Sequence, residues 1–280
     1  MDFKPGNAGQ APVCIVPFIC ALGALYIAYL TLDLYWPHMT LLSSLLKYTG
    51  IILCFLYALR SFEPIWIQQF SSPKRIFPFF KFLCRDANRS FILLLSFFAV
   101  LFSDYFLLFT NHAMAGVLLF ALIQILYFIY HSGVRKIPLF WGLSLLPALP
   151  LSFIFTGIFR LHGLLPVAGA IYISMLLVNI IFAVRIAVIC KTPAHVLFAA
   201  GLILYLLCDI NVGLINAGAF FSIHTPHSLD ILTTLPFRRI CAFFVWFFYL
   251  PAQALAALSL ACQTGNPAPC TATPDPAHEV

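Results

Sequence analysis

Four ionisable side chains lie within long apolar runs of this 280-residue sequence: Asp33, Lys47, Asp104 and Asp209. An ionisable group in apolar surroundings is costly, so it usually faces a cavity or a partner group. Two carboxyl groups held in different environments can divide the work of a general acid and a general base. We therefore expect Asp104 and Asp209 to be functional. Lys47 is equally suited to be a counter-ion for either of them or a substrate ligand, whereas Asp33 is expected to be interfacial.

Further polar residues recur at helical spacing in three of the apolar runs. Residues three, four or seven apart share one face of a helix. The three sets are Gln124, Tyr127 and His131; Tyr205, Asp209 and Asn216; and Trp246, Tyr249 and Gln253. Such faces serve either a binding site or hydrogen bonds between helices. Both interpretations stay open for Gln124, Tyr127, Tyr249 and Gln253.

Several motifs of other chemistries are missing from the sequence. It contains no G-x-S-x-G, H-E-x-x-H or P-loop pattern, and its nine cysteines form no C-x-x-C pair. The string from His224 to Asp230 reads H-x-x-H-x-x-D, but Pro226 interrupts it. We therefore predict no metal site and no disulfide framework.

Composition indicates the elements that must position these residues. Only 9% of the residues are charged and 62% are hydrophobic, which leaves too little polar surface for a soluble protein of this size. This argues against a soluble enzyme, a disordered chain and a nucleic-acid-binding protein. A helix needs about 20 apolar residues to cross the hydrocarbon core. Eight runs qualify, near 13–35, 39–60, 91–110, 113–131, 137–159, 164–186, 193–217 and 239–262. The run at 193–217 is weaker, because Asp209 and Asn211 interrupt it.

The predicted fold is an all-α, polytopic membrane bundle of about eight transmembrane helices. We expect an N-terminal tail at 1–12, a single membrane domain at 13–262 and a disordered tail at 263–280. Segment 61–90 mixes charged and aromatic residues, which is typical of an interfacial insertion. Eleven Lys and Arg residues lie on the side of the N-terminus and three on the other, so both termini are predicted to be cytoplasmic. The four ionisable groups then fall in the outer half of a bacterial inner, plasma or endomembrane.

Five pieces of the sequence, in order from about 40 to 260, resemble one family. They are Lys47; the FSDYFL segment around Asp104; Gly116, Phe120 and Tyr127; GLILYLLCD, which ends at Asp209; and Tyr249 to Gln253 followed by ALAALS. Together they resemble the signatures of the YhhN-like membrane protein family, which includes the lysoplasmalogenases. The sequence departs from the family pattern at four places. Gln124 replaces a histidine that could carry a proton, Cys208 a serine and Tyr48 a proline, and 61–90 resembles an insertion.

The resemblance implies hydrolysis of the vinyl-ether bond of a lysoplasmalogen to a fatty aldehyde and a glycerophospho-ethanolamine or -choline. It implies a lysophospholipid partner, catalysis by Asp104 and Asp209, and no metal or organic cofactor. The substrate-binding residues would be Lys47, Gln124, Tyr127, Tyr249 and Gln253. Two other classes stay open: a small proton-coupled transporter, because buried acids also build proton relays, and a non-catalytic lipid-binding protein.

Overall fold

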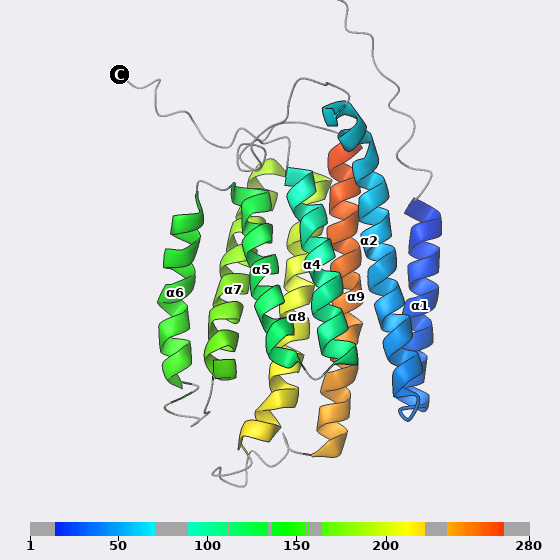
Figure 1. The fold of residues 1–280 in the computed structure, drawn as a ribbon, viewed down its shortest axis with the longest axis vertical. Coiled ribbons are helices and arrows are strands. Elements are labelled where there is room, and N and C mark those ends of the chain that lie inside the picture. Colours follow the sequence, from blue (N-terminus) through cyan, green and yellow to red (C-terminus); the bar gives the residue numbers. More distant parts are fainter. Residues whose placement is uncertain are drawn as a thin grey trace, which may run out of the picture.

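The computed structural model describes residues 15–70, 89–110, 112–133, 136–154, 156, 164–221 and 234–265. These ranges contain eight helices and no strand, which confirms the all-α prediction. The helices are α1 (Ile15–Tyr35), α2 (Thr40–Phe70), α4 (Arg89–Phe109), α5 (Ala113–Ser132), α6 (Ile137–Phe153), α7 (Leu164–Cys190), α8 (Pro193–Phe221) and α9 (Leu235–Gly265) (Figure 1).

Length and composition make this a multi-pass membrane protein. Seven of the described helices are long and apolar enough to cross a membrane, and α6 is a shorter apolar helix of 17 residues. Large apolar side chains cover the outside of the bundle, and Leu146, Leu149 and Phe153 on α6 are each at least 70% exposed. Such an exposed apolar surface is compatible with lipid and not with water. Multi-pass membrane insertion therefore follows from the architecture.

The helices stand side by side, with α1 and α6 at opposite edges and α4, α5, α8 and α9 between them (Figure 1). Helix α9 packs against α8 and α2, while α5 packs against α4 and α7. The beginning of α1 and the end of α9 lie at the same end of the bundle, at the top of Figure 1, as an even number of crossings requires. The assignment of that end to the cytoplasm stays a prediction.

Several predicted boundaries differ from the structure. Helix α2 continues to Phe70 and α9 to Gly265, past the predicted ends at 60 and 262. Helix α8 runs without a break through Asp209 and Asn211, where the sequence suggested a weaker span. Asn211 Nδ2 donates to the Leu207 carbonyl oxygen at 2.8 Å, so the side-chain amide finds a partner within its own helix. The predicted N-terminal tail, most of the 61–90 insertion and the His224–Asp230 string lie outside the described residues.

Two glycines allow the close helix contacts on which the site depends. A Cβ atom at Gly116 of α5 would lie 2.7 Å from the Leu107 side chain of α4. A Cβ atom at Gly201 of α8 would lie 3.0 Å from the Ala252 carbonyl oxygen of α9. Small residues let membrane helices approach closely, where van der Waals contacts drive their association. The first contact holds α5 against α4, which carries Asp104, and the second holds α9 against α8, which carries Asp209.

The cysteines are mostly small apolar side chains within the helices. Cys20, Cys54, Cys208, Cys241 and Cys262 are free thiols. Cys190, at the end of α7, is disulfide-bonded, which the sequence analysis did not predict. Cysteine spacing in the sequence does not identify which single pair of cysteines is joined.

Candidate functional site

Asp104 lies on the buried face of α4 and is only 3% exposed. Its two carboxyl oxygens accept the hydroxyl of Tyr249 on α9, at 2.9 Å and 2.8 Å. The preceding residue, Ser103, donates its hydroxyl to the Gly116 carbonyl oxygen of α5 at 2.9 Å, which fixes the rotation of α4. Within the described ranges Asp104 has no ion-pair partner. Its carboxyl group is therefore held by a neutral donor.

Asp209 has an equivalent partner on another helix. Its Oδ2 atom accepts the hydroxyl of Tyr172 on α7 at 2.6 Å, and the residue is partly exposed. No ion pair holds this carboxyl group among the described residues either. Tyr172 was not singled out from the sequence, although Asn179 lies seven residues after it and therefore on the same face of α7. The two aspartates thus share a donor type but differ in exposure.

One aromatic group connects the two aspartates. We call it the aromatic bridge: Phe120, Tyr172, Tyr205 and Tyr249. The ring of Phe120 has its centroid 6.2 Å from that of Tyr172, 5.9 Å from that of Tyr205 and 6.4 Å from that of Tyr249. The Tyr205 and Tyr249 centroids are 5.5 Å apart. The tyrosines that hold Asp104 and Asp209 therefore belong to a single cluster.

Lys47 is engaged elsewhere. Its Nζ atom lies 2.7 Å from Asp33 Oδ2, and Ser43 donates its hydroxyl to Asp33 Oδ1 at 2.5 Å. The ammonium also lies 5.1 Å from the Trp246 ring centroid and 5.8 Å from that of Tyr29. The idea that Lys47 is the counter-ion of Asp104 or Asp209 was wrong. Asp33, predicted to be only interfacial, takes that place because the short turn between α1 and α2 brings the two residues together.

The ion pair nevertheless adjoins the Asp104 site through one tryptophan. The ring of Trp246 meets the ring of Tyr249 edge to face, with centroids 5.3 Å apart. Tyr29 donates its hydroxyl to the Trp246 carbonyl oxygen at 3.0 Å, which anchors α1 to α9. Lys47 thus contacts the same aromatic side chain that packs against the hydrogen-bond donor of Asp104.

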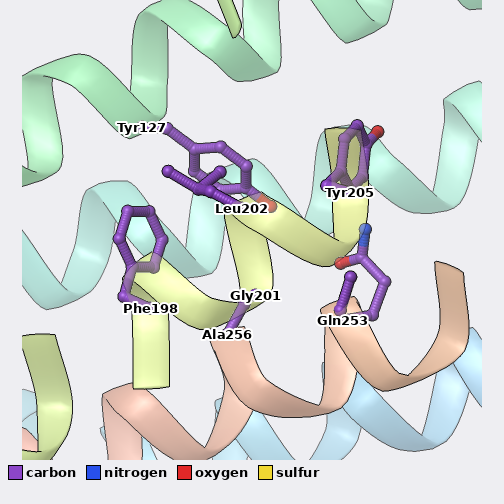
Figure 2. A pocket seen from close by; sticks show the side chains of 8 residues that line it. Tyr127, Phe198, Gly201, Leu202, Tyr205, Gln253 and Ala256 are labelled. Atoms are coloured by element: carbon purple, nitrogen blue, oxygen red, sulfur yellow. The ribbon is translucent and has the colours of Figure 1, made fainter. Parts of the chain in front are cut away.

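Tyr127 and Gln253 line a small cavity between α5, α8 and α9 (Figure 2). Its volume is about 10 Å³, and its other lining residues are Phe198, Gly201, Leu202, Tyr205, Ala252 and Ala256. Gln253 is 1% exposed, and its amide oxygen and nitrogen have no hydrogen-bond partner among the described residues. Asp104, Asp209 and Lys47 do not line this cavity. Two of the predicted substrate-binding residues therefore line a cavity that the predicted acids do not line.

Gln124 belongs to a different polar group. Asn179 of α7 donates its amide to Gln124 Oε1 at 2.9 Å and to the Gln124 carbonyl oxygen at 2.8 Å. The Asn179 Oδ1 atom lies 3.0 Å from His131 Nε2, which must then carry the proton. Gln124 and His131 share a helix face as predicted, but the sequence pattern did not indicate Asn179 as the residue that joins them. This arrangement is characteristic of hydrogen bonding between helices.

Chemically, the site offers two carboxyl groups on neutral tyrosine donors, a buried amide and a small cavity. Such groups can exchange protons with a bound molecule without a preceding separation of an ion pair. No group of three or more His, Cys, Asp or Glu residues that could hold a metal ion occurs in the part of the chain that the structure describes. Comparison with protein-family models, with curated proteins and with solved structures finds no match for this chain.

Proposed function

We propose that this protein is a membrane-embedded hydrolase that cleaves the vinyl-ether bond of lysoplasmalogens, with Asp104 and Asp209 sharing acid and base catalysis. The observation that carries the proposal is the pair of aspartates without ion-pair partners among the described residues, each bound by a tyrosine of one aromatic bridge. The order of the YhhN-like motifs along the chain supports the same proposal.

The reaction explains why two carboxyl groups would be useful. A protonated carboxyl group delivers its proton to the terminal alkene carbon of the vinyl ether, which generates an oxocarbenium ion. A water molecule adds to the cationic carbon and gives a proton to a carboxylate. The resulting hemiacetal collapses to a fatty aldehyde and a glycerophospho-alcohol. Positioned acids and bases accelerate such steps, and negative charge near the cation stabilises it further.

The different surroundings of the two carboxyl groups suit this division of labour. Asp104 is almost fully enclosed, whereas Asp209 is partly exposed. Groups in unlike environments can hold unlike protonation states at one pH. Phe-rich helices around them would accept the alkenyl chain of a lipid, and the sequence contains 30 phenylalanines. Lys47 would contribute to phosphate binding only by exchanging Asp33 for the phosphate.

The test is aldehyde release by the purified protein in lipid nanodiscs. Lysolipids with a vinyl-ether, an ester or an alkyl-ether linkage are compared, and only the first is expected to yield aldehyde. Asp104→Asn and Asp209→Asn keep the shape of the side chain but cannot transfer its proton, so each should lower the rate by about 10²–10⁴. Asn216→Ala is the matched control, because this exposed side chain on α8 bonds, among the described residues, only to the Val212 carbonyl oxygen of its own helix.

Two outcomes would contradict the proposal. Wild-type turnover in both Asn variants would refute the assignment of the acid and base. Absence of aldehyde from every vinyl-ether lysolipid would refute the hydrolase. In the second case, proton flux in sealed vesicles distinguishes a proton-coupled transporter from a non-catalytic lipid-binding protein.

A further inference from the structure

Gln253 is an unexpected residue for its position in α9. It is 1% exposed inside a membrane bundle, and neither atom of its amide has a hydrogen-bond partner in the described ranges. Burying an unpaired polar group carries a desolvation penalty that an apolar side chain of similar volume would avoid. Its neighbours along α9, Ala252 and Ala256, are small and apolar. Packing therefore does not explain an amide at position 253, whereas a bound ligand would explain it.

The cavity beside this amide has the size and the lining that a water molecule requires. A water site needs about 10–15 Å³ of volume and two to four polar partners. The cavity measures about 10 Å³, and Tyr127 and Tyr205 line it together with Gln253. Figure 2 shows the Tyr127 ring and the Gln253 amide on either side of the α8 segment that carries Leu202 and Tyr205. An amide offers both a donor and an acceptor, which matches the hydrogen bonds of water.

We propose that Gln253 holds one water molecule in this cavity, and that this water is the molecule consumed in hydrolysis. The second part rests on the proposed function. In that step the water oxygen forms a bond to the cationic carbon of the oxocarbenium ion, and one water proton passes to a carboxylate. Collapse of the hemiacetal then breaks the carbon–oxygen bond to the glycerol, whose oxygen receives a proton.

The position of the cavity relative to the two acids supports this role. Tyr205 lines the cavity, and its ring lies 5.5 Å from that of Tyr249, the donor to Asp104. Asp209 follows Tyr205 by one turn of α8, so it lies on the same helix face. Neither carboxyl group lines the cavity, but Tyr205 connects it to Asp104 through the Tyr249 ring and to Asp209 along α8.

The packing of α8 against α9 restricts the site to a very small molecule. At Gly201 a Cβ atom would lie 3.0 Å from the Ala252 carbonyl oxygen and 3.4 Å from the Leu255 Cβ atom. The cavity wall beside Gly201 is thus formed by the α9 backbone, which cannot shift easily to admit a larger molecule. A cavity of about 10 Å³ lies at the lower limit for one water molecule, so we expect it to hold water and not a larger nucleophile such as methanol.

The first test measures turnover of a vinyl-ether lysolipid by Gln253→Leu. We expect the turnover number to fall by about 10²-fold with an unchanged KM, because water and not lipid is misplaced. A rise in KM at constant turnover number would assign Gln253 to lipid binding and overturn the proposal. Gln253→Met is tested alongside, so that a folding defect of one variant does not decide the result.

The second test enlarges the cavity. Leu202→Ala should admit methanol as a competing nucleophile, so that a mixed methyl acetal appears beside the aldehyde in methanol-containing buffer. Leu204→Ala is the matched control, since Leu204 lies on the same helix but does not line the cavity. Equal acetal formation by wild type, Leu202→Ala and Leu204→Ala would show that the nucleophile does not come from this cavity.

The third test does not depend on activity. A high-resolution density map of the wild-type protein in nanodiscs should contain an ordered water within hydrogen-bond distance of the Gln253 amide, and the map of Gln253→Leu should lack it. A dry cavity in the wild type would overturn the water site even if the enzyme is active. An ordered water in a protein that releases no aldehyde would uphold the site and refute the proposed function instead.

Discussion

The ion pair between Asp33 and Lys47 offers the clearest energetic prediction, and Asp33→Asn is the perturbation. The substitution keeps the shape of the side chain and its ability to accept the Ser43 hydroxyl, but it removes the negative charge. Lys47 then stays between Trp246 and Tyr29 without an anion. A buried charge that has lost its partner is strongly destabilising, because its desolvation is no longer offset.

The structure narrows the expected loss of unfolding free energy in Asp33→Asn. Removal of one partner of a fully buried pair costs about 3–5 kcal/mol. The Asp33 side chain is 18% exposed and that of Lys47 10%, so the pair is not fully buried. The rings of Trp246 and Tyr29 also continue to stabilise the ammonium by about 0.5–2 kcal/mol. We therefore expect Asp33→Asn to lower the free energy of unfolding by about 3 kcal/mol, the lower end of the range.

The double variant Asp33→Asn/Lys47→Met should recover most of that loss, since it removes the uncompensated charge and keeps an unbranched apolar side chain. Thermal unfolding of the purified single and double variants in one detergent measures both effects. Thr31→Val is the control, because within the described part of the chain this hydroxyl bonds only to the Ile27 carbonyl oxygen of α1. A loss below about 1 kcal/mol, or a double variant no more stable than Asp33→Asn, would mean that the pair behaves as an exposed one.

Two further predictions concern the site and the topology. Tyr249→Phe removes the only hydroxyl that bonds Asp104 among the described residues, and it should lower the turnover of a vinyl-ether lysolipid by about 10²-fold or more. Tyr172→Phe removes the corresponding hydroxyl from Asp209 and should also lower turnover. Unchanged turnover in both variants would show that the tyrosines take no part in the chemistry. Reporter proteins fused after Gly265 and inserted within 61–90 should both report the cytoplasm, and an exterior signal from either would reverse the predicted orientation.

The helices were predictable because hydrocarbon imposes a length and a backbone geometry on every crossing segment. Their ends were less predictable, since α2 and α9 extend beyond the apolar runs that define their spans. Nothing in the hydrocarbon requires a helix to end where the lipid ends. Residue types at positions such as 60 and 262 therefore mark the edge of the membrane and not the end of the helix.

The candidate site was predictable along each helix but not between helices. Helical spacing grouped Gln124 with His131 and Tyr205 with Asp209. In the structure Gln124, His131 and Tyr205 are buried and Asp209 is partly exposed. The spacing did not reveal Tyr172 or Asn179 of α7 as their partners, because most of the residues around them in this helix are apolar. A partner on a neighbouring helix depends on the rotation and height of that helix, and these are determined by contacts such as that of Ser103 with Gly116.

The pairing of Lys47 with Asp33, and not with Asp104 or Asp209, has a consequence for the chemistry. A lysine beside Asp104 or Asp209 would hold that carboxyl group in its ionised form and oppose proton transfer. Because Asp33 takes the ammonium, the charge of Lys47 is used to join α1, α2 and α9, and the other two aspartates keep neutral donors. The bundle thus keeps the Asp33–Lys47 ion pair, which stabilises the fold, apart from Asp104 and Asp209, whose carboxyl groups have neutral donors. If that separation matters, Asp33→Asn should lower stability much more than it lowers turnover per folded molecule, whereas Asp104→Asn should do the reverse.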